Sequence, residues 1–469
     1  MRIINKVRFI ITPRFRTKFF VCRKISFPQR RFNEAGRKLH LLLAACLKKA
    51  VPATYRSGGH LFSLVILLCI TIATTALTGC SSGLLPSGGN NAFDMTKISR
   101  ETVDGNSRFA FDLFRQLNTE DENKSLFISP LSISTALTMT YQGAGSTTKE
   151  AMAKTLGYSG IEDATLNESY SNLLRYLKKL DKKVELNIGN SLWIREGETI
   201  REEFISANKD YFDASVTPLD FSQKDAADQI NKWISNATEK KIDKMIDSPI
   251  SPDIVMYLIN AIYFKGDWTK QFDTKNTFDT QFHKEDGSTV EVKMMSRNGK
   301  LEYGQGDGYK VVRLPYGSGK AAMYCVLPEE GNSVHKLINS LNLEKWTAIR
   351  ESISEKEEVQ LQLPRFKLEY GIKNLNDSLT ALGMGEAFTD VADFSGIREE
   401  LSISRVLHKA VIEVNEEGSE AAAATVVEVK ETSAAVPLTF IADRPFVFII
   451  ADDDTGTILF AGKLYGEAF

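Results

Sequence analysis

The chain has almost no cysteine outside its first 80 residues. Four of its five cysteines precede residue 81, which leaves Cys325 alone in the rest of the chain. A single thiol cannot form an internal disulfide, so that part must fold by packing alone. Motifs for zinc, phosphate or a nucleophilic serine are also absent, including H-E-x-x-H, C-x-x-C, G-x-x-x-x-G-K-[ST] and G-x-S-x-G. We therefore expect no enzyme, no metal site and no cofactor.

Charge is absent over one long stretch, because no Asp, Glu, Lys or Arg lies between Ser57 and Phe93. Before that stretch, residues 1–60 hold 15 Lys+Arg and a single acid, Glu34. The remaining 409 residues carry a net charge of -16, so the overall value of -2 describes neither part. The composition, 43% hydrophobic and 25% charged, is that of a globular protein and excludes a disordered or fibrous chain.

The charge-free stretch contains an apolar run, LFSLVILLCITI at 61–72, followed by small residues and LTGC at 77–80. This layout predicts a secretory signal. The tetrad resembles the bacterial lipobox, which implies cleavage before Cys80 and lipidation of its thiol. The alternative is a transmembrane helix over 61–77, which is short against the roughly 20 residues needed to span a bilayer.

We therefore expect a signal peptide over 61–79, then lipidated Cys80 and a flexible tether over 80–101. The protein would be an exported lipoprotein anchored in a bacterial cell envelope, either periplasmic or exposed at the surface. Residues 1–60 form a basic leader without any nucleic-acid-binding pattern. We expect this leader to be removed or never translated, and no nucleic-acid partner.

The body from 102 to 469 mixes helical and strand patterns without a linker or a repeat. Apolar residues three or four apart predict helices over 109–117, 130–141, 173–180 and 226–242. Alternating or continuous apolar runs predict strands over 184–194, 255–264, 311–314, 321–327, 359–363, 410–414, 446–450 and 458–462. The run 255–264 should be buried on both faces. This order predicts a single α+β domain.

The segment 416–436, EEGSEAAAATVVEVKETSAAV, is the most informative one. Its alanines suit a helix, but the parity of a strand separates its residues better. Odd positions from Ser419 to Val429 are small and uncharged, whereas even positions from Glu420 to Lys430 hold every charge. No proline interrupts the ladder before Pro437. The segment therefore looks able to be a loop in one state and a central strand in another.

Five short sequences resemble, in order, motifs of the serpin family. They are FISPLSI at 127–133, NAIYFKGDW at 260–268, ADFSGI at 392–397, HKA at 408–410 with EEGSEA at 416–421, and FIADRPF at 440–446. The resemblance covers roughly residues 102–469. It implies an α+β serpin fold with three β-sheets, about nine helices and an exposed reactive-centre loop on a metastable monomer.

The resemblance also implies suicide inhibition of serine proteases, in which the cleaved loop inserts into the large sheet and traps the acyl-enzyme. It assigns the hinge to Glu416, Glu417, Gly418, Ser419, Glu420, Ala421, Ala422, Ala423, Ala424 and Thr425. Family spacing puts the reactive bond at Thr432–Ser433, within a window of 429–435. The small residues there suit an elastase-like protease. The alternative is a non-inhibitory serpin that acts as a cleavable substrate or a surface-binding module.

Control residues are also implied by the resemblance. Ser129, Ser132, Asn260 and His408 match a polar cluster beneath the point where the large sheet opens. Trp268, Arg365 and Glu416 match the region that the loop enters first. A buried hydrogen-bond network of this kind sets how easily the sheet parts.

Overall fold

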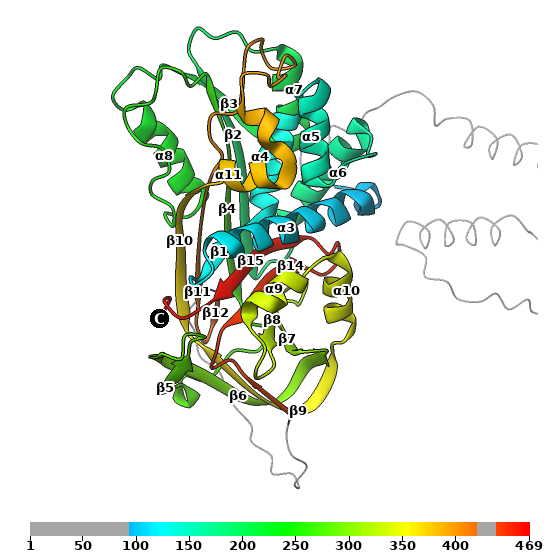
Figure 1. Cartoon of the computed structure of the whole chain (residues 1–469), viewed down its shortest axis with the longest axis vertical. Coiled ribbons are helices and arrows are strands. Elements are labelled where there is room, and N and C mark those ends of the chain that lie inside the picture. The colour runs from blue at the N-terminus through cyan, green and yellow to red at the C-terminus, as the bar shows by residue number, and fades with distance from the viewer. Residues whose placement is uncertain (1–92, 420–437) are drawn as a thin grey trace, which may run out of the picture. The chain divides into compact units, whose positions relative to one another are not determined.

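The computed structural model describes residues 93–419 and 438–469, which belong to one compact unit (Figure 1). The leader, Cys80, the hinge from Glu420 to Thr425 and the bond Thr432–Ser433 lie outside these ranges. Within the described ranges, none of the helices is both long enough and apolar enough to cross a membrane.

Nine α-helices lie in the described residues, most of them in the first half. They are α3 (Arg100–Glu120), α4 (Pro130–Tyr141), α5 (Ser146–Leu156), α6 (Asp163–Leu177), α7 (Glu202–Phe212), α8 (Ala226–Ala237), α9 (Val334–Ser340), α10 (Leu343–Glu351) and α11 (Asn376–Leu379). The predicted bounds of α4 are confirmed, because Ser129 caps its N-terminus and Pro130 occupies the first turn. Helix α8 ends five residues before the predicted end, because Glu239 and Lys240 adopt positive φ.

Residues 93–99, expected to be part of a tether, are instead folded against α6. Phe93 packs edge-on against Tyr176, with ring centroids 5.4 Å apart. The Ser99 backbone N–H donates to Ser169 Oγ over 3.0 Å, and α3 then begins at Arg100. The folded domain therefore starts before the predicted boundary at 102.

A nine-stranded sheet forms one part of the fold, in the order β1-β15-β14-β8-β7-β6-β9-β13, with β5 paired to β6. Its strands are β1 (Leu126–Ile128), β5 (Phe278–His283), β6 (Thr289–Gly306), β7 (Tyr309–Tyr316), β8 (Ala321–Pro328), β9 (Ser354–Pro364), β13 (Leu438–Ile441), β14 (Phe446–Asp452) and β15 (Ile458–Leu464). Every residue of β8, β14 and β15 is buried. Cys325 lies within β8, and its burial raises the pKa of the thiol well above the usual range, so it is an inert core residue.

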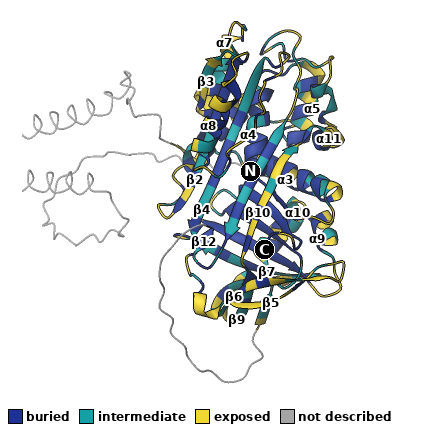
Figure 2. Cartoon of the chain, turned by 90° about the vertical axis from the view of Figure 1, so that its left-hand side faces the viewer, coloured by how far each residue is buried: buried dark blue, intermediate teal, exposed yellow. Residues whose placement is uncertain are grey.

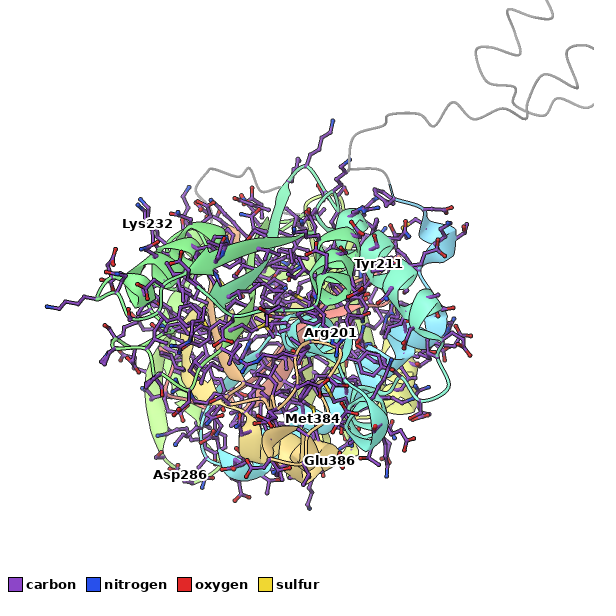
Figure 3. All side chains as sticks on the ribbon, turned by 90° about the horizontal axis from the view of Figure 1, so that it is seen from above. Arg201, Tyr211, Lys232, Asp286, Met384 and Glu386 are labelled. Carbon is purple, nitrogen blue, oxygen red and sulfur yellow. The ribbon has the colours of Figure 1, made fainter. Side chains whose placement is uncertain are left out.

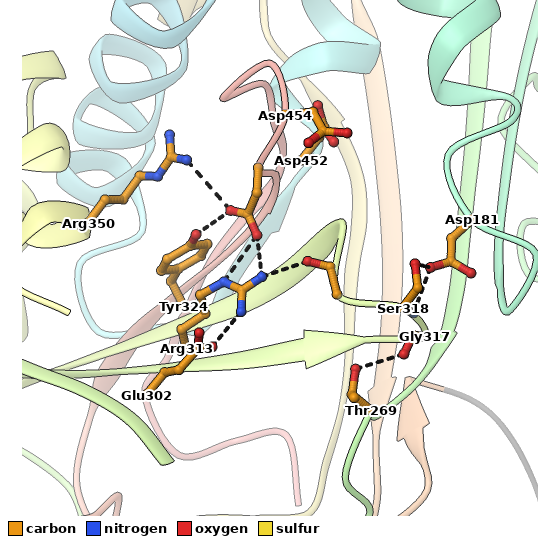
Figure 4. A network of polar contacts seen from close by, with 12 residues as sticks. Asp181, Thr269, Glu302, Arg313, Gly317, Ser318, Tyr324, Arg350, Asp452 and Asp454 are labelled. Atoms are coloured by element: carbon orange, nitrogen blue, oxygen red, sulfur yellow. Dashed lines mark hydrogen bonds and ion pairs between the residues drawn. The ribbon is translucent and has the colours of Figure 1, made fainter. Parts of the chain in front are cut away.

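An ion-pair network fastens the turn of the β14–β15 hairpin to β7 (Figure 4). Arg313 on β7 donates to Asp453 from Nε over 3.0 Å and also pairs with Glu302. Tyr324 donates its hydroxyl to Asp453, and Arg350 approaches the same carboxylate. The hairpin is therefore held by both packing and charge.

Two further sheets complete the count of three. One has four strands in the order β12 (Gly418–Ser419), β4 (Met256–Asp267), β2 (Val184–Arg195) and β3 (Ala214–Leu219). The other pairs β10 (Phe366–Asn374) with β11 (Leu407–Val414). Their long strands lie alongside one another (Figure 2). Contrary to the prediction for 255–264, many residues of β4 are only half-buried.

Candidate functional site

The space between β4 and β11, which we call the gap, is the centre of the candidate site. Residues 256–262 of β4 and 407–409 of β11 line one cavity of about 160 Å³. Beyond β11, residues 415–417 meet the other end of β4 at Trp268. The two strands therefore run in the same direction. Within the described residues they share no ladder, so each has an edge facing the gap.

The hinge enters the gap at the Asp267 end of β4, where β12 pairs antiparallel with β4. Gly418 lies opposite Asp267 and Ser419 opposite Gly266. A Cβ atom on Gly418 would lie 2.1 Å from the carbonyl oxygen of Gly266, so only glycine allows this approach. Two hinge residues thus already occupy the edge of β4.

Trp268 holds the chain just before that pairing. Its backbone N–H donates to the Glu417 carbonyl over 2.8 Å, and its indole Nε1 donates to the Asn415 carbonyl over 2.9 Å. Its ring stacks on Tyr316 with centroids 4.5 Å apart. The Tyr316 hydroxyl lies 2.9 Å from Ser419 Oγ, so Ser419 points into the core.

Glu416 is buried beside this point and carries a charge. Its Oε2 accepts from Arg365 Nε over 2.6 Å, and Thr277 donates to its Oε1. Burial alone would raise its pKa, but the hydrogen bonds from Arg365 and Thr277 outweigh burial and lower the pKa below its usual value. The structure thus brings the three predicted residues Trp268, Arg365 and Glu416 together.

A second polar group lies under α4, near the middle of β4. The Ser129 backbone N–H donates to His408 Nε2 over 3.1 Å, and Ser129 Oγ donates to the Leu459 carbonyl over 2.8 Å. The Ser132 hydroxyl donates to the Asn260 carbonyl over 3.4 Å. Burial lowers the pKa of His408 to about 4, so its ring is neutral at pH 7.

Asn260 turns its amide away from the other three predicted members of the cluster. Its Nδ2 donates to Asn190 Oδ1 over 2.6 Å, and Asn190 Nδ2 donates to the Phe212 carbonyl. Asn260 Oδ1 is buried and has no hydrogen-bond partner among the described residues. The sequence did not predict the role of Asn190, because only the register between β2 and β4 shows that it lies opposite Asn260.

The predicted residues therefore form two groups along one gap. Of the hinge, the described part is 416–419, and the reactive bond and Cys80 lie outside it. In the described residues, no group of three His, Cys, Asp or Glu could hold a metal ion. The gap has room for one more strand, with one polar group at the Trp268 end and the other near the middle of β4.

The comparisons with known proteins agree with this arrangement. The model of the family "Serpin (serine protease inhibitor)" matches residues 104–466. An uncharacterized serpin-like protein of Methanosarcina acetivorans is 36% identical, covering 76% of this chain and 84% of that protein. The leukocyte elastase inhibitor of Bos taurus is also 36% identical, over 76% of this chain and 97% of that one.

Among solved structures, the thermophilic serpin tengpin in its native state matches with a TM-score of 0.70 and 32% identity. The match covers 80% of this chain and 95% of that one.

Proposed function

This chain belongs to the serpin (serine protease inhibitor) family and is not an enzyme, and we propose that it traps elastase-like serine proteases as a suicide substrate. In this proposal the protease cuts the loop at Thr432–Ser433 and becomes covalently attached. The cleaved loop then fills the gap between β4 and β11 before the acyl-enzyme can be hydrolysed.

The observation that carries this proposal is the register of β12 on β4. Gly418 lies opposite Asp267 and Ser419 opposite Gly266, so the antiparallel ladder fixes the partner of each later residue. Continued down β4, this register sets Ala421 opposite Phe264, Thr425 opposite Asn260 and Val429 opposite Met256. The loop has the length needed to pair with the whole of β4.

The same register sorts the loop's two faces correctly. Residues directly opposite each other in an antiparallel pair point to the same side of the sheet. Even-numbered residues of β4, such as Leu258 and Ile262, pack against the main core, whereas Tyr257 and Ile259 pack against the cluster under α8. The small, uncharged odd positions of the loop would therefore face the main core.

Insertion is favourable because, among the described residues, β11 has no partner strand at the gap and β4 has one there only at Gly418 and Ser419. A strand placed there would bond to β4 and β11, each bond contributing about 1 kcal/mol net. Thr425 would also bring its hydroxyl beside the unpaired Oδ1 of Asn260. The uncut protein holds this free energy in reserve, which supports a mechanism that depends on stored strain.

The target class rests on the loop sequence and on one relative. Val, Thr, Ser and Ala surround the reactive bond, which suits a protease with a small apolar pocket. The bovine relative is named as an inhibitor of leukocyte elastase. We also propose that the inhibitor acts at a bacterial cell envelope, anchored to the membrane through lipidated Cys80.

The test is to incubate the protein with pancreatic or neutrophil elastase and to separate the products on a denaturing gel. We expect a covalent band at the summed mass. Ala421→Glu should abolish that band and leave only a cut chain, because residue 421 would face the core. Ala422→Glu is the matched control and should keep the band, because residue 422 faces away from the main core. A wild-type chain that is only clipped would instead be a substrate and would overturn the proposal.

A further inference from the structure

Two positive side chains near the start of the hinge lack an acidic partner. Arg297 on β6 is half-buried, its guanidinium lies 4.9 Å from the centroid of the Phe272 ring, and it donates to the Lys270 carbonyl. The Lys270 ammonium lies against Gly299, since a Cβ atom on that glycine would be 3.9 Å from Nζ. The two cations are therefore neighbours, and among the described residues neither forms an ion pair with a carboxylate.

Other cations on the same strand are paired. Lys293 Nζ lies 2.6 Å from Asp279 Oδ1, and Lys300 Nζ lies 2.7 Å from Glu355 Oε1. The lack of a partner is thus particular to the position of Arg297 and is not a property of β6 as a whole.

The unpaired state has an electrostatic cost. Burial lowers the pKa of Arg297 to about 10, so the guanidinium still carries its charge at pH 7. Burial, and then the charge of Arg297, lower the pKa of Lys270. Among the described residues the guanidinium donates only to the Lys270 carbonyl, which leaves N–H groups for an added acceptor. A carboxylate placed here would offset the repulsion and accept those bonds.

The pair lies between the two points at which the described chain stops and resumes around the reactive loop. Phe272 donates its backbone N–H to the Glu416 carbonyl over 2.9 Å, just before the first of these points. At the second, Leu438 lies opposite Val359, and Val359 lies opposite Gly299. Two strand spacings, about 10 Å, therefore separate the backbone of Leu438 from that of Gly299. Strands β6 and β9 lie at this end of the molecule (Figure 1).

A protease bound at the reactive bond would reach this pair. Ser433 precedes Leu438 by five residues, so the bond lies within about 18 Å of β13. An interface of standard size covers about 800 Å² on each partner, which is a patch of about 16 Å radius. If the protease brought no acceptor, the half-buried guanidinium of Arg297 would lose water without gaining a partner.

We propose that Arg297 and Lys270 form a docking site for an acidic side chain at the rim of the target protease's active-site cleft, and that this site selects among elastase-like proteases. This inference rests on the proposed function. The carboxylate of the protease accepts from the guanidinium and pairs with the ammonium. A protease with a basic or an apolar group in the same place docks more slowly, because it leaves the cations repelled or unpaired.

The rate at which pancreatic elastase cuts the loop, measured at several salt concentrations, tests the site. This rate can be measured whether the protease is then trapped or released. We expect Arg297→Gln and Lys270→Gln each to slow cutting about fivefold at low salt and to lessen its salt dependence. Lys300→Gln is the matched control, because it removes the same charge from a lysine that is already paired. Lys232→Gln on α8, far from β6, is the distant control (Figure 3).

The two controls should change the rate by less than about twofold. Equal slowing by all four variants would reveal only an effect of net charge and would overturn the site, as would rates that no variant changes. If Glu420→Gln slowed cutting as much as Arg297→Gln and the two effects did not add, the cations would serve the loop and not the protease. Lys270 is exposed, so its variant decides the matter if Arg297→Gln does not fold.

The same experiment separates this inference from the proposed function. A chain that is cut at the expected rates but traps no elastase would refute the proposed function and leave the docking site standing. A chain that traps elastase equally fast with and without the two cations would refute the docking site alone. A chain that elastase does not cut would overturn both.

Discussion

The nine-stranded sheet and the split pair of sheets differ in how completely their strands are used. Strands β8, β14 and β15 are paired on both sides and buried throughout. Strand β4 has a full partner in β2, but only two residues of β12 on its other edge. The centre of the nine-stranded sheet is therefore fully paired, whereas, among the described residues, the gap beside β4 could still take one more strand.

This difference shows where the molecule keeps its stability and where it keeps its capacity for change. Buried ladders and the Arg313 network make the nine-stranded sheet a fixed frame. Among the described residues, the gap combines a cavity, the Asn260 amide oxygen without a hydrogen-bond partner, and two strand edges that are paired only at Gly418 and Ser419; each of these costs stability until it is filled. A protein that must insert a strand needs both kinds of region.

The largest expected effect separates the two regions directly. Leu464→Ala, in fully buried β15, should lower the free energy of unfolding by about 2–5 kcal/mol. Leu258→Ala on β4 removes the same atoms from a side chain that is only half-buried, so its cost should stay below about 2 kcal/mol. Urea unfolding of both variants measures this, and equal losses would contradict the contrast.

The second-largest effect should come from acid, which lowers the free energy of unfolding through His408 in the gap. The pKa of His408 is about 4 in the folded protein against an ordinary 6.5, so the unfolded chain takes up a proton first as the pH falls. Stability should therefore drop between pH 6.5 and 4, by about 3 kcal/mol in all. His408→Gln cannot titrate and should lack this component. Urea midpoints at pH 7 and 4.5 test it, and identical pH dependence in the two proteins would refute it.

A smaller effect belongs to the point where the hinge enters. Glu416 has a lowered pKa, so its contribution is present above the ordinary value of 4.5 and is lost as the pH falls. Glu416→Gln should cost about 1–2 kcal/mol at pH 7, because it weakens the bond to Arg365. Glu357→Gln is the control, since Glu357 is 86% exposed and should cost almost nothing. Similar unfolding midpoints for the two variants would count against a special role for Glu416.

The smallest effect concerns one hydroxyl. Thr425→Val should destabilise the loop-cleaved protein by about 1 kcal/mol, because Asn260 Oδ1 would again lack a donor. The uncut protein should be unaffected. Val427→Thr adds a hydroxyl two residues away and should not compensate in the double variant. If Thr425→Val changed both forms equally, the register drawn from β12 would be wrong.

Local signals predicted much of the frame. Ser129 and Pro130 mark the start of α4, and the alternation in 184–194 predicts β2. The strand β6 was missed because Lys, Arg and Glu side chains interrupt its apolar pattern. For β9, only 359–363 showed a strand pattern, since 354–358 are polar and exposed. Pairing in the sheet, and not the side chains, makes those segments strands.

The candidate site was predicted only where a motif carries it. The pairing of Arg365 with Glu416 and the contact of Ser129 with His408 bring together residues that the family resemblance had named. The contact of Asn190 with Asn260, and the lack of a hydrogen-bond partner for Asn260 Oδ1 among the described residues, depend on the register between β2 and β4. No local pattern fixes that register, so the sequence could not indicate the unpaired atom.

The central claim is that the gap between β4 and β11 receives the loop as a strand. Cutting the loop once within 429–435 with a protease that is not trapped, and then measuring thermal unfolding, tests this claim most directly. Pairing the inserted loop with both β4 and β11 should raise the melting temperature by about 10 °C or more over the uncut protein. A cut protein that melts at the same temperature as the uncut one, or below it, would show that the gap stays empty and would contradict the account.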